Sequence, residues 1–371
     1  MRRMIALALA LMLCGVALAE SVPGNRLGYK VLAELSGGER NAFVSPVSLA
    51  WALSMAAKGA EGETREKLLK ALEAEDTDAV TALGAPLTES GVRWANAAFT
   101  AAGVELKPAY AGRLADGYAA ERFPLEGAEG VADWVREKTD GLIEDIPLET
   151  DGSARLVLAN AVALEAEWAS PFEPGDTWED DFHAPEGDVR VPFMHQETYA
   201  QYGESMGVQL ACKGYVNGRL ALMIALPPEG GLKRALNNLA ENPKSFFTFK
   251  PNPQQLALSL PKLDFSTSAS LKDALIGAGC KLPFDADKAD FSGISDAPLV
   301  ISDVLQQVRF QVDEEGTRAA AATEVVMAEG AALDDGPRPV DFNCNRPFIV
   351  AVADRSTGAI LFAGAVVNPA G

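Results

Sequence analysis

The spacing of hydrophobic and polar residues predicts a chain that mixes helices with buried strands. Residues Ser48 to Leu72 show helical spacing that is interrupted at 58–62, so two consecutive helices are expected there. Ser45 and Pro46 supply a cap and a stiff start for the first of them. Apolar runs bounded by turn residues predict buried strands at Leu156–Val162, Leu220–Leu226, Leu256–Leu260, Val304–Val312, Phe348–Ala353 and Ala359–Val367.

These elements follow one another irregularly, which favours an α+β fold over a repeating βαβ barrel. The chain shows no internal repeat and no long linker, only short turn clusters such as Pro227–Gly231. We therefore predict one continuous domain over residues 20–371.

Residues 1–19 have the pattern of a secretory signal peptide. Arg2 and Arg3 precede an apolar run, Ile5–Leu18, which ends in small residues before Glu20. A membrane anchor needs about 20 continuous apolar residues, so this run is too short to span a bilayer. We expect cleavage after Ala19 and a mature protein that is secreted or periplasmic, without a membrane span.

Composition and charge narrow the classes of partner. Of the 371 residues, 48% are hydrophobic and 23% charged, as in an ordinary globular protein with a large core. The formal net charge is −20, and removing Arg2 and Arg3 with the signal takes it to −22. Such an acidic surface repels phosphate backbones, so we expect no nucleic acid and no heparin-like polyanion as partner.

After the signal the chain keeps Cys212, Cys280 and Cys344, which are widely spaced and odd in number. A disulfide framework is not expected from such a set, although an exported protein could form one. Cys14 could carry a lipid, but Leu13 before it is bulkier than the residue that this processing prefers. Because no cysteine or histidine cluster has metal-ligand spacing, we predict no metal and no cofactor.

One hydrolase motif occurs, but its context argues against catalysis. Gly203–Gly207 fits the GxSxG pattern of a nucleophile elbow, with Ser205 as the nucleophile. That catalytic order requires a histidine after the serine, whereas His183 and His195 both precede it. We predict a hydrogen-bonding surface role for the two histidines, and that the chain is not an enzyme.

The segment Glu314–Gly330 is unusual because four consecutive alanines, 319–322, follow soon after a glycine. Helix propensity alone favours a short helix, since alanine is the best helix former. However, the segment follows a predicted strand and runs into the acidic, proline-bearing stretch Asp334–Pro339, which is typical of an exposed loop. The local pattern leaves both interpretations open.

Residues Glu314–Thr323 resemble the proximal hinge of the reactive-centre loop in serpins, which reads Glu-x-Gly-Thr-x-Ala-Ala-x-Ala-Thr. Other segments resemble serpin motifs in the same order along the chain. They are Asn41–Ser48, Asn160 with Trp168 and Phe172, Val191–Met194, Leu260–Lys262, Ala289–Gly293, Cys344–Ile349 and Gly364–Pro369. The resemblance covers essentially the whole chain after the signal.

This resemblance implies the serpin fold: three β-sheets with a large central sheet, about eight to nine helices, and an exposed reactive-centre loop at about 314–340. It also implies an inhibitor that a serine protease attacks as a substrate. After acylation, the cut loop inserts into the central sheet and carries the covalently tethered protease with it. We expect a monomer with a serine protease as partner. The alternative is a non-inhibitory serpin that acts as a binder or chaperone.

The resemblance assigns hinge roles to Glu314, Gly316, Thr317, Arg318, Ala319, Ala320, Ala321, Ala322 and Thr323. Side chains of an inserting strand alternate between core and solvent, and small ones pass most easily between existing strands. Thr317, Ala319, Ala321 and Thr323 are expected to face inward. Arg318 replaces the acidic residue that is common in the family, but it is expected to face solvent and to leave insertion intact.

The reactive bond is predicted at Gly330–Ala331, about fourteen residues after the hinge glycine by family analogy. Counting back from Pro347 gives a position near Gly336 instead, so the predicted window runs from Met327 to Asp335. Most side chains there are small or apolar, which suits an elastase-like or subtilisin-like protease. Glu329 leaves a glutamyl-specific protease open.

The resemblance also assigns Ser45, Ser48, Asn160, Trp168 and Gln306 to the region where the central sheet opens. Gln306 stands where many serpins carry a histidine. A glutamine side chain can both donate and accept hydrogen bonds, so sheet closure is expected to persist. We predict that Gln306 bonds to Asn160 and Ser48.

Overall fold

The computed structural model describes residues 22–139, 141, 155–243, 252–317 and 338–371. Within them the chain forms nine α-helices and two short 3₁₀ helices. The α-helices are α2 (Asn25–Ser36), α3 (Pro46–Gly59), α4 (Gly62–Leu72), α5 (Asp78–Thr81), α6 (Gly84–Glu89), α7 (Pro108–Tyr118), α8 (Ala128–Lys138), α9 (Leu232–Glu241) and α11 (Lys272–Gly277). The 3₁₀ helices are Pro174–Asp176 and Leu282–Phe284.

The largest sheet has nine strands in the order β1-β16-β15-β9-β8-β7-β10-β14, with β6 paired to β7. These strands are β1 (Ala42–Val44), β6 (Thr177–Ala184), β7 (Gly187–Ser205), β8 (Val208–Gly214), β9 (Leu220–Leu226), β10 (Asn252–Pro261), β14 (Val340–Asn343), β15 (Phe348–Asp354) and β16 (Ile360–Val366). Long apolar runs such as β9 and β15 are buried along their whole length.

Two smaller sheets lie side by side. One contains β3 (Glu121–Pro124), β2 (Arg93–Thr100) and β4 (Leu156–Ala163), and the other contains β11 (Leu263–Ser270), β12 (Leu305–Val312), β13 (Gly316–Thr317) and β5 (Ala166–Glu167). The chain passes from β4 into β5 through two residues, so the sheets share one continuous segment. Within the described ranges no ladder joins β4 to β12, although the two strands are neighbours. We call this unpaired boundary the seam.

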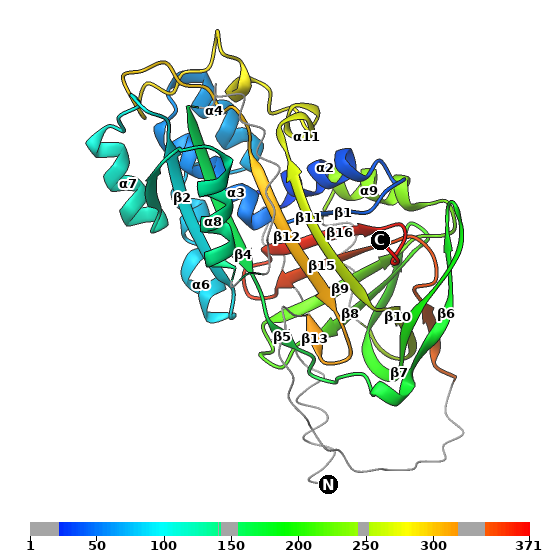
Figure 1. The fold of residues 1–371 in the computed structure, drawn as a ribbon. Helices are drawn as coiled ribbons and strands as arrows, with labels where there is room; N and C mark the ends of the chain where they lie inside the picture. Colours follow the sequence, from blue (N-terminus) through cyan, green and yellow to red (C-terminus); the bar gives the residue numbers. More distant parts are fainter. Residues whose placement is uncertain (1–21, 140, 142–154, 244–251, 318–337) are drawn as a thin grey trace.

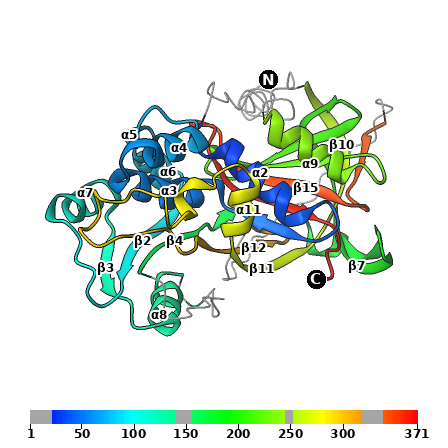
Figure 2. The same cartoon turned by 90° about the horizontal axis from the view of Figure 1, so that it is seen from above.

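Helices cover both faces of the three-stranded sheet. Seen from above, α8 lies on one side of β2 and β4, and α3 lies on the other (Figures 1 and 2). Alternate residues of β4 divide accordingly, because side chains in a strand point to opposite faces. Leu156 and Leu158 belong to the main core with α3, whereas Val157 and Ala159 pack in a second cluster with α8.

The elements predicted from local pattern are confirmed. The two helices are α3 and α4, the Ser45 hydroxyl caps α3 by accepting from the Ser48 amide at 3.3 Å, and all six strand predictions coincide with observed strands.

The GxSxG segment is a tight hairpin turn between β7 and β8, with φ of 52° at Met206 and 78° at Gly207. It is therefore not a strand-to-helix elbow. In the part of the chain described, no helix combines the length and hydropathy needed to cross a membrane.

Candidate functional site: the loop hinge and its contacts

The first residues of the predicted reactive-centre loop form part of the four-stranded sheet. After β12 the chain makes a tight turn in which the Asp313 carboxylate accepts from the amides of Glu315, at 2.9 Å, and Gly316, at 3.0 Å. It then returns as β13, which pairs antiparallel with β12 on one side and with β5 on the other. The short strand β13 therefore separates β12 from β5.

A segment just after β5 holds this turn by its backbone. The Trp168 amide donates to the Glu315 carbonyl at 2.8 Å, and the Phe172 amide donates to the Glu314 carbonyl at 2.9 Å. The Trp168 indole nitrogen donates to the Asp313 carbonyl at 2.9 Å. Three successive carbonyls of the turn are thus satisfied by one neighbouring segment, which fixes the position at which the loop starts.

The Glu314 side chain adds a charged contact. Its carboxylate lies 2.7 Å from the Lys262 ammonium and accepts from the Thr177 hydroxyl at 2.8 Å. Burial by itself would raise the pKa of Glu314, but the hydrogen bonds from Lys262, from backbone and from Thr177 lower it overall. The carboxylate is therefore ionised at neutral pH and ties the hinge to the end of β10.

Gly316 and Thr317 fit closely against the core. A Cβ atom on Gly316 would lie 2.1 Å from the Ala166 carbonyl oxygen, so only glycine allows β13 to approach β5 this closely. Thr317 is buried, and its hydroxyl lies 2.5 Å from that of Tyr215. Thr317 therefore faces inward, as predicted.

A lysine lies buried behind the same segment. Lys213 on β8 is 6% exposed, and its ammonium donates to the Ser170 carbonyl at 2.6 Å and to the Gln196 side-chain oxygen at 2.7 Å. The ammonium lies 4.3 Å from the centre of the Phe172 ring and 5.4 Å from that of Trp168, a cation–π arrangement. Lys213 thus supports both residues whose amides hold the hinge.

Burial lowers the pKa of Lys213 to about 7. The physical cause is desolvation, because an ammonium away from water loses its hydration. Within the described residues no carboxylate lies close enough to form an ion pair with it. Its charge consequently changes near neutral pH.

Of the residues assigned to the opening of the central sheet, Ser45, Ser48 and Gln306 lie together at the start of α3. The Gln306 amide bonds to the backbone of Ser45, accepting from its N–H at 2.8 Å and donating to its carbonyl at 2.9 Å. The predicted bonds from Gln306 to Ser48 and Asn160 were wrong, because the backbone N–H and C=O of Ser45, at the start of α3, pair with the oxygen and the nitrogen of the amide instead. Asn160 instead donates to Asn96 at 2.6 Å.

Several predicted site residues lie outside the described residues. They are Arg318, Ala319, Ala320, Ala321, Ala322 and Thr323 of the hinge and the bond Gly330–Ala331 with its window Met327–Asp335. The predicted histidine roles can be placed: His183 Nδ1 lies 2.8 Å from Asp188 Oδ1, and His195 Nδ1 lies 2.9 Å from the Ser259 hydroxyl. Both histidines hydrogen-bond within the largest sheet.

Sequence reasoning did not single out Lys213, Tyr215 and Asp313 as parts of the site. Asp313 carried a usable signal, since an aspartate just before a glycine-containing turn often bonds to the next amides. Lys213 carried none, because a single lysine in a strand is usually exposed. Its role depends on residues more than forty positions earlier in the chain.

Comparison with known proteins points to one family along nearly the full length. The family described as serpin (serine protease inhibitor) matches residues 24–369. A serpin-like protein of Thermococcus kodakarensis is 35% identical over 93% of this chain and 84% of its own. An alpha-1-antitrypsin-like protein of Tamias sibiricus is 30% identical over 92% of this chain and 86% of its own. The native-state structure of the thermophilic serpin tengpin is 27% identical, with a TM-score of 0.83 and 93% of each chain covered.

Proposed function

Since the chain belongs to the serpin family, the serine protease inhibitors, we propose that it inhibits a serine-type endopeptidase by acting as a suicide substrate. The observation that carries this proposal is the position of Gly316 and Thr317, paired between β12 and β5 at the β5 end of the seam. The loop thus starts as a strand already in line with a place where a further strand would fit.

The proposed reaction begins as ordinary proteolysis at Gly330–Ala331. The protease serine oxygen forms an ester with the Gly330 carbonyl carbon, the peptide bond breaks, and the Ala331 amine leaves with a proton. Residues after Thr317 then enter the seam as a strand antiparallel to β4 and β12. Each added residue contributes ladder hydrogen bonds of about 0.5–1.5 kcal/mol, so about ten residues supply a driving force comparable to the stability of a domain. The ester-linked protease is carried along and its active site is distorted.

The proposals for the target and for the location rest on the sequence. Small and apolar residues in the window Met327–Asp335 favour an elastase-like or subtilisin-like protease. We propose export after cleavage at Ala19, because residues 1–19 have the pattern of a secretory signal peptide, and we propose a monomer that forms a one-to-one covalent complex. Mass spectrometry of the exported protein would give Glu20 as its first residue.

The experiment is incubation of the purified mature protein with a subtilisin-like and an elastase-like protease, followed by denaturing electrophoresis. We expect a complex that survives denaturation and a released peptide that begins at Ala331. The matched control is Thr317→Arg, because a long charged side chain cannot occupy the buried position beside Tyr215. That variant should be cleaved without forming the complex. Cleavage of the natural protein with no complex and no gain in stability would favour the binding or chaperone alternative.

A further inference from the structure

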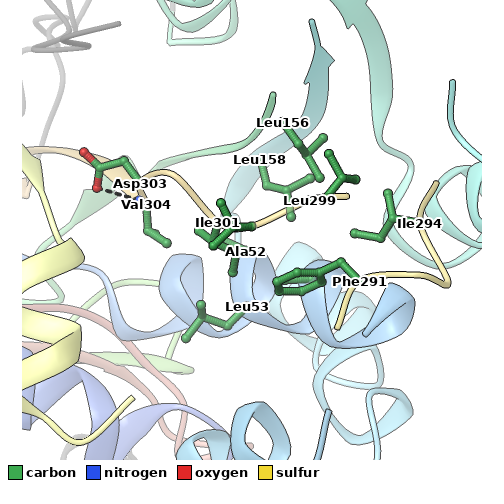
Figure 3. A pocket seen from close by; sticks show the side chains of 12 residues that line it. Ala52, Leu53, Leu156, Leu158, Phe291, Ile294, Leu299, Ile301, Asp303 and Val304 are labelled. Carbon is green, nitrogen blue, oxygen red and sulfur yellow. Dashed lines mark hydrogen bonds between the residues drawn. The ribbon is translucent and has the colours of Figure 1, made fainter. Parts of the chain in front are cut away.

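Two hollows in the fold differ in the chemistry of their linings. In the first, Leu156 and Leu158 of β4 point toward Ala52 of α3 (Figure 3). Its one charged lining residue is Asp303, whose carboxylate already accepts from the Val304 amide at 2.7 Å. The second hollow has a volume of about 290 Å³ and lies between α2, α4 and the chain just after α11. We call it the basic pocket, because its charged lining residues are Arg26, Lys30, Lys67, Lys70 and Glu73.

Helical spacing gathers the four cations of the basic pocket. The two cations of α2 are four residues apart and the two of α4 are three apart, so each pair occupies one face of its helix. The Gly24 amide donates to the Leu72 carbonyl at 2.9 Å and thereby joins the start of α2 to the end of α4. The basic pocket is therefore built into the packing of two helices.

This arrangement of charge opposes the stability of the fold. Like charges three or four residues apart on a helix repel each other, so each pair destabilises its own helix. Arg26 also lies in the first turn of α2, which has no acidic residue and where the helix dipole is positive. The chain has 52 acidic and only 32 basic residues, so composition does not explain the local excess of positive charge. An anion in the basic pocket would offset these repulsions.

Three ammonium groups of the basic pocket are available to a ligand. Among the described residues, neither Lys30 nor Lys70 has a hydrogen bond or an ion pair. Lys67 has a contact of 3.6 Å with the exposed carboxylate of Glu63. Exposed ion pairs of this kind contribute little free energy, so Lys67 can exchange Glu63 for another anion.

The fourth cation, Arg26, is held in place by the fold. Its guanidinium lies 3.0 Å from Glu73 and 3.3 Å from Glu241, and its Nε donates to the Ala240 carbonyl at 3.3 Å. Glu73 is the one carboxylate that lines the basic pocket. Four cations and one carboxylate leave the lining with a formal charge of +3.

We propose that the basic pocket binds a compact anion that carries two or more adjacent phosphate groups. Lysine and arginine are the usual protein partners of phosphate. One phosphate group carries a charge of about −1.5 to −2 at neutral pH, so two are needed to balance the lining. The ligand is small, because sites for small molecules usually have volumes of about 300–1,000 Å³ and this pocket lies at the lower end.

The rest of the chain selects for a compact ligand. A long polyanion would extend past the basic pocket onto a surface whose formal charge, −20 for the whole chain, repels it. Figure 1 shows α2, α4 and α11 at the end of the molecule away from β13. The proposed anion site is therefore separate from the hinge and does not rest on protease inhibition.

The first measurement is calorimetry of the purified mature protein with inorganic triphosphate, with sodium chloride used to hold the ionic strength constant. A ligand that binds only the native state raises the unfolding midpoint, and we expect a saturable rise. Isothermal titration should give a stoichiometry of about one. A parallel titration with a nucleoside triphosphate identifies the source of the phosphate groups. Equal dissociation constants indicate that the phosphate chain alone is recognised, and tighter binding indicates a nucleotide.

Substitutions of single charges locate the site. Lys30→Gln and Lys70→Gln should each weaken triphosphate binding about tenfold, because each removes one charged hydrogen bond to the ligand. Neither ammonium has a partner in the fold, so without ligand both variants should unfold at the natural midpoint or above it. The matched control is Lys233→Gln, since Lys233 is exposed at the start of α9 and should leave binding unchanged. Glu73→Gln should tighten binding severalfold, because it removes the carboxylate from the lining.

Several results would overturn the anion site. One is the same dissociation constant for Lys30→Gln, Lys70→Gln and Lys233→Gln. Another is an unfolding midpoint that follows ionic strength alone, with no saturable effect of triphosphate. Tighter binding of a long heparin chain than of triphosphate would contradict the compact ligand. None of these results bears on protease inhibition, which is tested separately by formation of the covalent complex.

Discussion

Replacement of Lys213 by methionine tests whether a titrating group lies behind the hinge. Methionine keeps an unbranched apolar side chain of similar length but removes the charge and the two hydrogen bonds to Ser170 and Gln196. In the native protein burial lowers the pKa of Lys213 from its ordinary 10.5 to about 7. In the unfolded chain the pKa returns to its ordinary value.

The sign of the effect follows from proton binding. Between pH 7 and 10.5 the unfolded chain holds the Lys213 proton and the native protein does not, so native stability rises with pH in this window. Below pH 7 both states are protonated and the contribution is constant. The slope is about 1.4 kcal/mol per pH unit, and the total reaches at most about 5 kcal/mol near pH 10.5. The Lys213→Met protein lacks this dependence.

The assay is urea unfolding of both proteins at pH values from 6 to 9.5, with tryptophan fluorescence as the measure of unfolding. The difference in unfolding free energy, natural protein minus variant, should be flat near pH 6 and then rise by about 1.4 kcal/mol per pH unit above pH 7. Lys281→Met serves as control, because Lys281 is exposed and should give a flat difference. Parallel curves for the natural protein and Lys213→Met, or a Lys213 NMR titration near pH 10.5, would refute the reasoning.

Three further predictions concern other contacts of the fold. Glu314→Gln should lower thermal stability by about 2–4 °C in differential scanning calorimetry, since the Lys262 ion pair is partly exposed and contributes about 1 kcal/mol. Gly316→Ala should speed hydrogen exchange in β13 at least tenfold, because its methyl group would collide with the Ala166 carbonyl; an unchanged exchange rate would contradict the close approach. Burial by itself raises the pKa of Asp354, but hydrogen bonds from Ser356, Ser90 and Thr357 lower the pKa overall. The stability that the Asp354 carboxylate contributes is therefore present above about pH 4 and is lost as the pH falls further. Asp354→Asn should therefore show a shallower acid-unfolding curve than the natural protein, and equal slopes would argue against this role.

Local pattern was sufficient for much of the fold. The cap at Ser45 and the break between α3 and α4 are encoded by adjacent residues, and buried strands such as β9 and β15 are uninterrupted apolar runs. Such elements need no knowledge of their neighbours. The irregular order of helices and strands indicated an α+β fold, and the resemblance to serpins then supplied the arrangement in three sheets, which periodicity alone does not provide.

The contacts of the site required the assembled structure. Gln306 was expected to bond to side chains, but the nearest donor and acceptor are backbone groups of Ser45, brought in by packing of α3. The proximity of Lys262 to Glu314 joins residues 52 positions apart, and nothing in either neighbourhood distinguishes that lysine from a surface one. Long-range partners of this kind depend on strand order, which the sequence pattern leaves undetermined.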